Sequence, residues 1–243
     1  MREIRPSGLE GGAGSSIPVP TPIITRPDVR MGIETLKFFD PMADTDVTAN
    51  NLPHWDQDGR TYFVTFRAAD SLPAGIRSEF EHALNAWLKW HPKPWDEQTE
   101  YEYWEHFGQK TEKWLDESHG ACLLRQPRLA EIVGNALQFH EGKLSRQHAW
   151  VVMPNHVHAL FSTMGDGALS KLLHSWKSFT SNEINKAVGA SGSFWQKDYF
   201  DRLIRSTEHF WRCARYIRKN PSNLRQGGFR LWESDWLAKG LDA

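Results

Sequence analysis

The sequence contains only two cysteines, Cys122 and Cys213, and no apolar run approaching the roughly 18 residues that a membrane-spanning helix needs. So few cysteines argue against a disulfide framework and against a cysteine-ligated zinc site. The first six residues, Met1–Pro6, lack the apolar core of a signal peptide. We therefore expect a cytoplasmic protein that does not contact a membrane.

Net charge is also nearly absent, at −1 over 243 residues, but it is unevenly distributed. From Glu81 to Gly120 there are nine acidic and four basic residues, whereas from Gly167 to Arg230 there are twelve basic and four acidic ones. This asymmetry indicates that the C-terminal half faces a polyanion such as nucleic acid. Solvated helix faces would give the same counts, so charge alone leaves both interpretations open.

Composition and periodicity divide the chain into three parts. Residues 1–52 are rich in Gly, Ser and Pro near their start and lack sustained periodicity, which predicts a flexible N-terminal extension. Residues 53–228 contain the periodic segments and form the predicted domain. Within it, the acidic, Trp/Tyr-rich residues 91–120 predict a helical insertion, and residues 229–243 are expected to be a C-terminal tail.

The predicted domain contains apolar segments with two kinds of spacing. Short β-branched and aromatic runs predict strands, and runs with apolar residues every three or four positions predict helices. Two consecutive strands separated only by Pro154-Asn155 should pair antiparallel, so we predict an α+β fold with helices packed on one face of the sheet. The expected strands are 61–66, 149–153, 156–161 and 199–205, and the expected helices are 74–90, 128–139, 168–188 and 207–220.

The segment Ala149–Phe161 contains the first candidate site. Side chains alternate along a strand, so His156 and His158 point to the same face, and two imidazoles so placed can bind a divalent metal. The same pattern is also typical of a half-buried strand with polar residues on its wetter face.

The last predicted helix contains the second candidate site. Tyr216 lies four residues after Arg212 and four before Asn220, so the three share one stripe of the helix. The Asn220 amide oxygen could complete a metal site begun by the histidines, and such a mixed nitrogen and oxygen set suits Mn²⁺ better than Mg²⁺. Taken alone, Tyr216 also fits an ordinary surface tyrosine, because periodicity does not show where the helix packs.

Three blocks in order, Pro154–His158, Phe194–Asp201 and Ala214–Pro221, resemble the single-tyrosine HUH transposases, and among them the REP-associated tyrosine transposases. The resemblance spans about Leu52 to Gly228, with the strand Thr61–Phe66 matching the first strand of the family. It implies a ferredoxin-like antiparallel sheet with helices packed on one face. The N-terminal extension and the insertion depart from compact members of the family.

The resemblance also implies roles for individual residues. His156 and His158 match the paired metal ligands, Tyr216 the nucleophile, and Asn220 the third ligand, with Mg²⁺ or Mn²⁺ as the metal. The implied activity is a metal-dependent single-strand DNA endonuclease and transposase that cleaves and rejoins DNA through a 5′-phosphotyrosine intermediate. Candidate DNA-binding residues come from the second block and from the basic excess, and they are Trp195, Gln196, Arg205, Arg212 and Lys219.

The implied partner is single-stranded or hairpin DNA of the REP type, bound by a monomer or a homodimer. One alternative is a domesticated protein that binds a DNA sequence or hairpin without cleaving it. A metal hydrolase of the His-x-His-x-Asp-His kind is disfavoured, because Leu160 and Phe161 stand where its Asp and second His would be.

Overall fold

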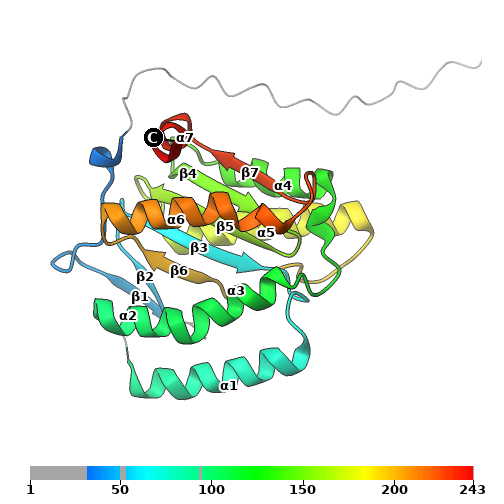
Figure 1. Cartoon of the computed structure of the whole chain (residues 1–243), viewed down its shortest axis with the longest axis horizontal. Coiled ribbons are helices and arrows are strands. Elements are labelled where there is room, and N and C mark those ends of the chain that lie inside the picture. Colours follow the sequence, from blue (N-terminus) through cyan, green and yellow to red (C-terminus); the bar gives the residue numbers. More distant parts are fainter. Residues whose placement is uncertain (1–31, 50–52, 93–94, 243) are drawn as a thin grey trace, which may run out of the picture. The chain divides into compact units, whose positions relative to one another are not determined.

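A five-stranded antiparallel sheet forms the centre of the fold in the computed structural model, which describes residues 32–49, 53–92 and 95–242. The strand order is β6-β3-β5-β4-β7, and every neighbouring pair is antiparallel (Figure 1). The order β6-β3-β5-β4, with a helix that covers the sheet between β3 and β4 and another between β5 and β6, is that of a ferredoxin-like βαββαβ unit. The strands are β3 (Thr61–Arg67), β4 (Ser145–Val152), β5 (His156–Thr163), β6 (Phe200–Leu203) and β7 (Arg230–Glu233).

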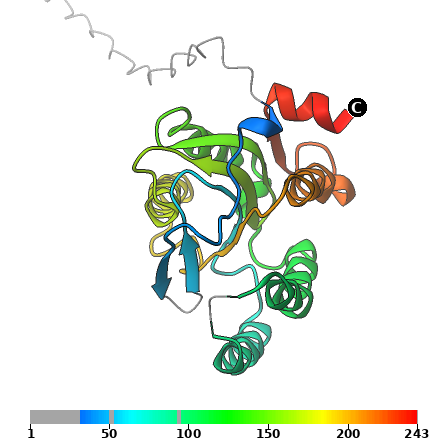
Figure 2. The ribbon, with the colours of Figure 1, turned by 90° about the vertical axis from the view of Figure 1, so that its left-hand side faces the viewer.

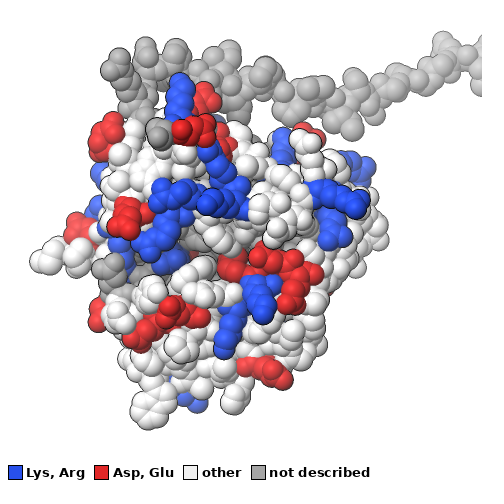
Figure 3. Space-filling view, in the orientation of Figure 1, with Lys and Arg blue, Asp and Glu red and all other residues white. Residues whose placement is uncertain are grey.

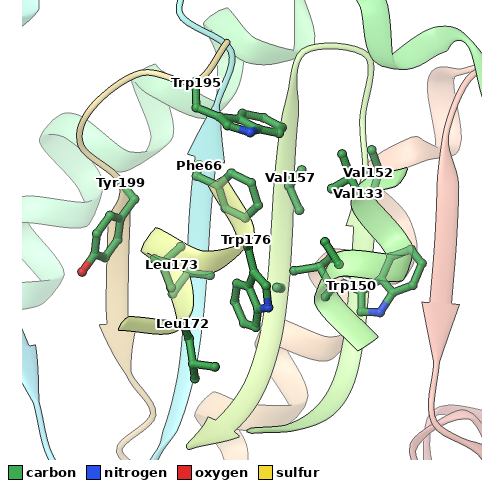
Figure 4. Close-up of a cluster of buried hydrophobic side chains, with 14 of the residues drawn as sticks. Phe66, Val133, Trp150, Val152, Val157, Leu172, Leu173, Trp176, Trp195 and Tyr199 are labelled. Carbon is green, nitrogen blue, oxygen red and sulfur yellow. The ribbon is translucent and has the colours of Figure 1, made fainter. Parts of the chain in front are cut away.

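Two helices, α4 (Pro127–Gln138) and α5 (Leu169–Val188), cover one face of this sheet. Their apolar stripes meet alternate residues of the strands, so that Trp176 of α5 lies against Phe161 of β5 with ring centroids 5.0 Å apart. Figure 4 shows this core, with Trp176 and Leu172 of α5 beneath the strands. Gly189 ends α5 in the left-handed conformation that glycine adopts most easily (φ 69°). The predicted α+β fold, with an antiparallel sheet and helices packed on it, is confirmed.

A further helix, α6 (Thr207–Lys219), packs on the opposite face. Ser206 caps its first turn, because the Ser206 hydroxyl accepts a hydrogen bond from the His209 backbone N–H (3.1 Å). Viewed along the sheet in Figure 2, α5 lies on one side of the strands and α6 on the other. The fold therefore has a second helical layer, beyond the one that the sequence predicts.

The acidic stretch is a helical insertion, as the sequence predicts. Helix α1 (Ala74–Trp90) is followed by α2 (Glu97–Tyr103), a π-helical turn (Trp104–Gly108) and α3 (Gln109–Asp116). These helices share a small aromatic core built around Phe80, whose ring lies 5.7 Å from that of Phe107. Phe200 of β6 borders the same core, so the insertion is packed against the edge of the sheet.

The predicted flexible extension is only partly tested, since residues 1–31 and 50–52 lie outside the described residues. Where the chain is described, the prediction is wrong. Lys37 accepts a backbone hydrogen bond from Thr61 (3.0 Å), and Phe39 donates one to Ile204 (2.8 Å). A short hairpin follows, made by β1 (Asp46–Ala49) and β2 (Pro53–Asp56). Contacts with distant backbone hold this segment, and such contacts leave no periodicity in the sequence.

The predicted C-terminal tail, 229–243, is also wrong for the residues that the structure describes. Strand β7 pairs with β4, and Trp232 stacks on Trp150 at a centroid distance of 6.0 Å. Helix α7 (Asp235–Asp242) follows and buries Leu237 completely. None of the described helices has the length and apolar content that crossing a bilayer requires.

His148 of β4 should make the fold sensitive to acid. Its side chain is fully buried, its Nε2 atom lies 2.8 Å from the Ser162 hydroxyl, and burial lowers its pKa to about 3. The unfolded chain has the ordinary pKa of about 6.5, so below that pH the unfolded state binds a proton that the folded state excludes. The stabilisation is complete above about pH 6.5 and is lost as the pH falls toward 3.

We therefore expect the free energy of unfolding in urea to decrease between about pH 7 and pH 5, and to decrease by about 2 kcal/mol less in His148→Gln. Equal decreases in both proteins would assign the acid sensitivity to other groups.

Candidate active site

His156 and His158 lie on β5, on the sheet face that α6 covers. Both side chains are fully buried, and their ring centroids are 4.7 Å apart. The register places His156 opposite Arg67 of β3, and His158 opposite Thr65. Directly paired residues share a face, so all four side chains meet on one side of the sheet. The alternation argument made from the sequence describes this strand correctly.

Each histidine is oriented by a neighbour. Asn155 Oδ1 accepts a hydrogen bond from His156 Nδ1 (2.8 Å), and the Thr65 hydroxyl lies 2.8 Å from His158 Nδ1. Both Nε2 atoms are buried and have no hydrogen-bond partner among the described residues. Burial, and then the neighbouring His158, lower the pKa of His156 well below its usual value, which keeps this ring neutral. A neutral imidazole held through one nitrogen presents the other as a metal ligand.

Helix α6 brings Tyr216 to these histidines. Its buried residues include Phe210, Ala214 and Ile217, which pack against the sheet. Tyr216 borders this stripe, and its ring lies edge-on to that of His158 at 5.2 Å. The condition that the sequence left open, a last helix lying over the histidine strand, is therefore met.

The Tyr216 hydroxyl has two partners. It donates a short hydrogen bond to the Glu112 carboxylate and accepts one from Asn220 Nδ2 (3.0 Å). Burial raises the pKa of Tyr216 well above its usual value, and the negative charge of Glu112 raises it further. The tyrosine is therefore a neutral phenol in this arrangement. The other amide atom, Asn220 Oδ1, is buried and has no partner among the described residues.

Glu112 was not among the residues predicted from the sequence. It comes from α3 of the insertion, is 9 % exposed, and its Oε2 lies 3.3 Å from His158 Nε2, although the two are not aligned as a hydrogen bond. The sequence contained one signal for Glu112, because this acid lies on the same face of the helix as Leu115, and the structure buries both. An acid on the apolar face of an otherwise solvated helix is unusual and indicates a specific partner.

The residues present fit a divalent metal. Ligand atoms of Glu112, His156 and His158 all lie within 4.8 Å of one another. Asn220 adjoins this cluster through Tyr216, and its buried Oδ1 needs a positively charged or donor partner. Two imidazoles, a carboxylate and an amide oxygen form a mixed set that suits Mn²⁺ well and also accepts Mg²⁺.

The candidate DNA-binding residues lie in different environments. Trp195 is only 2 % exposed, packs against Phe66 at 4.8 Å and donates a hydrogen bond from Nε1 to the Thr180 hydroxyl (2.8 Å), so its ring is a core anchor rather than an exposed stacking surface (Figure 4). Gln196 follows it, half-buried, with its backbone N–H donating to Arg67 O (2.9 Å). Arg205 is half-buried, with its guanidinium over the ring of Phe39.

The remaining candidates lie on the outer side of α6. Arg212 and Lys219 are exposed there, together with Arg215, and we name these three residues the α6 stripe. Figure 3 shows basic side chains gathered over α6 and acidic ones over the end of α3 beside it. The candidate site therefore lies between the basic helix α6 and the carboxylates at the end of α3.

Part of the chain matches the model of a known protein family. Residues 125–233 match the family model described as "Transposase IS200 like". This match covers 109 of the 243 residues and includes strands β4 and β5 and helix α6. The matched residues include His156, His158, Tyr216 and Asn220 but not Glu112, which precedes them. Helix α3 therefore adds a carboxylate to the candidate site from outside the matched residues.

Among solved structures, the chain is similar to a REP-associated tyrosine transposase bound to a REP hairpin. The sequences are 16 % identical, the likeness covers 72 % of this chain and 74 % of that one, and the TM-score is 0.41. A comparison with curated proteins gives no match.

Proposed function

We propose that the protein is a cytoplasmic, metal-dependent single-strand DNA endonuclease and transposase. In this proposal it cleaves and rejoins DNA through a 5′-phosphotyrosine, at hairpins of the REP type. One observation carries it: Tyr216 lies edge-on to His158, one of two neighbouring buried histidines whose Nε2 atoms have no hydrogen-bond partner among the described residues. A nucleophile beside a ready-made set of metal ligands suits covalent phosphodiester transfer.

His156, His158, Glu112 and Asn220 are the residues that would hold the metal. A divalent cation bound there would polarise a non-bridging phosphate oxygen and offset the negative charge that accumulates at phosphorus. The protein supplies the rest. Thr65 and Asn155 hold the two imidazoles in place, and the packing of α6 on the sheet fixes the position of the tyrosine oxygen.

The chemical step balances with the residues present. The Tyr216 oxygen forms a bond to phosphorus, the bond from phosphorus to the 3′-oxygen breaks, and the 3′-oxygen leaves and becomes a hydroxyl by taking a proton from water. Glu112 accepts the hydrogen bond from the tyrosine, so its carboxylate is placed to take the phenolic proton. Attack by another 3′-hydroxyl on the phosphotyrosine reverses these changes and joins the strands without an external energy source.

The α6 stripe provides a path for the DNA backbone. The side chain of Arg212 is 63 % exposed, and its ion pair with Glu208 is long, at 4.0 Å. The charge of Arg212 therefore remains available to phosphates. Because the stripe lies on the same helix as Tyr216, phosphates bound along it would lead the strand to the nucleophile.

A denaturing gel tests this function. Labelled single-stranded hairpins from the flanks of the protein's own gene are incubated with the full chain in Mn²⁺ or in EDTA. We expect a protein–DNA band that resists denaturation and forms only with metal. Tight binding without such a band, in Mg²⁺ as well as Mn²⁺, would instead support a domesticated DNA-binding protein.

A further inference from the structure

Arg67 of β3 is a buried cation that forms no direct ion pair with the described residues, although Glu81 and Asp198 are near enough to stabilise its charge. The side chain lies opposite His156 in the sheet and is 7 % exposed. Its Nη1 donates a hydrogen bond to the Ser71 hydroxyl (3.2 Å), and no carboxylate among the described residues forms an ion pair with it. A guanidinium has five N–H donors, and one hydrogen bond to a hydroxyl leaves most of them unused. Burying a charge in this way is costly unless a ligand completes it.

Arg67 lines a cavity of about 140 Å³ between α1 and the segment 196–200. Apolar side chains, among them Phe80, Leu84 and Phe200, form much of its wall. Asp198 also lines it, and the Oδ1 atom of Asp198 is buried with no hydrogen-bond partner in the described part of the chain. The cavity therefore combines apolar walls with two polar groups. The Arg67 guanidinium has donors that make no described hydrogen bond, and the Asp198 Oδ1 atom has no described donor. It is much smaller than the roughly 300 Å³ or more of a typical pocket for a drug-sized ligand, and suits a single flat ring system.

The cavity adjoins the candidate active site. Thr65 lines it and also contacts His158 Nδ1 through its hydroxyl (2.8 Å). Arg67 is the neighbour of His156 across the β3–β5 ladder. A group bound in the cavity would therefore lie next to the phosphate at the histidines, within the same stretch of DNA.

Among the DNA bases, guanine matches this lining. Its O6 and N7 atoms are adjacent acceptors that an arginine contacts in bidentate fashion, and its N1–H and N2–H₂ groups are adjacent donors for one carboxylate. Adenine, cytosine and thymine each lack one of these two adjacent pairs. We infer that this cavity holds an unpaired guanine of the DNA, read by Arg67 and Asp198. The inference rests on the proposed function, because it requires a single DNA strand at the histidines.

Fluorescence anisotropy tests the inference with the full chain carrying Tyr216→Phe, in Mn²⁺. The probes are labelled oligothymidylates that contain one central dG, dA or dC, or none. A flexible single strand can shift so that its one dG reaches the cavity, so we expect the dG probe to bind about tenfold more tightly than the others. Replacing dG by deoxyinosine, which lacks the N2 amino group, should remove part of this preference.

Two substitutions should abolish the preference while leaving the affinity for oligothymidylate within about twofold. They are Asp198→Asn, which keeps the shape of the side chain, and Arg67→Gln. Glu79→Gln is the matched control, since Glu79 is an exposed carboxylate of α1 that does not line the cavity. A general effect of charge would appear in this control too.

The inference is overturned if the four probes bind equally, or if the preference survives in Asp198→Asn. In either case the proposed function is not affected, because it requires only that a single DNA strand is bound and is tested separately by the covalent adduct. If no probe binds, the proposed function fails and the guanine cavity fails with it.

Discussion

The full chain carrying Tyr216→Phe is expected to form no covalent adduct with DNA, while it retains its affinity for DNA within about twofold. The substitution removes one oxygen atom, which is the proposed nucleophile. It keeps the ring that packs edge-on to His158 (5.2 Å) and to Phe63 (5.9 Å), so the fold and the DNA-binding surface should remain intact. The adduct is measured on a denaturing gel in Mn²⁺, and affinity by anisotropy with the same hairpins.

Tyr199→Phe is the matched control for this loss. Tyr199 comes from the block that precedes β6 and stacks on His54 at 3.9 Å, but no described contact joins it to the two histidines of β5. This variant should form the adduct at a rate close to that of the wild type. If the adduct persists in Tyr216→Phe, the nucleophile is another residue, and Tyr199 becomes the first alternative.

The parts of the site that could be predicted are those set by local pattern. Alternation along β5 places His156 and His158 on one face whatever the strand pairs with. The spacing of four residues places Tyr216 and Asn220 together on α6 in the same way, and the structure joins them by a hydrogen bond of 3.0 Å. Helix α1 has the predicted limits, Ala74–Trp90, since an apolar stripe is likewise a local feature.

The parts that escaped prediction depend on contacts between distant segments. Glu112 and Tyr216 are separated by 104 positions, and no pattern within α3 states which residue its buried acid will meet. Strand β7 has only four residues and is recognisable through its pairing with β4. Trp195 was predicted to contact DNA on the strength of its motif. Its core position depends on Phe66 and Thr180, which are distant in the sequence.

Electrostatics explains why the insertion matters for the chemistry. Residues 91–120 contain eight acidic residues, and most of those whose side chains the structure describes are exposed. Among these described side chains Glu112 is buried, and its charge raises the pKa of Tyr216. The same carboxylate that keeps the tyrosine protonated in this arrangement is also a potential metal ligand. A bound cation would offset the charge of Glu112 and so make the phenolate less costly.

Glu112→Gln should therefore weaken metal binding and slow the chemical step together. The substitution keeps the size of the side chain and an oxygen that can accept from Tyr216, but it removes the negative charge. We expect the affinity for Mn²⁺, measured by electron paramagnetic resonance of the free ion, to fall about 10- to 100-fold. At saturating Mn²⁺ the initial rate of adduct formation should fall about 100-fold or more, because the acceptor of the tyrosine proton is lost.

Asp116→Asn separates this role from a general effect of acidic charge. Asp116 lies one turn further along α3 and also contributes to the raised pKa of Tyr216, but through space and without a hydrogen bond to the hydroxyl. The Asp116→Asn substitution should change the affinity for Mn²⁺ and the rate of adduct formation by less than about threefold. Equal losses in the two variants would reduce Glu112 to one acid among several near the site. Unchanged Mn²⁺ affinity in Glu112→Gln, with a slow chemical step, would leave Glu112 as a proton acceptor and restrict the metal ligands to His156, His158 and Asn220.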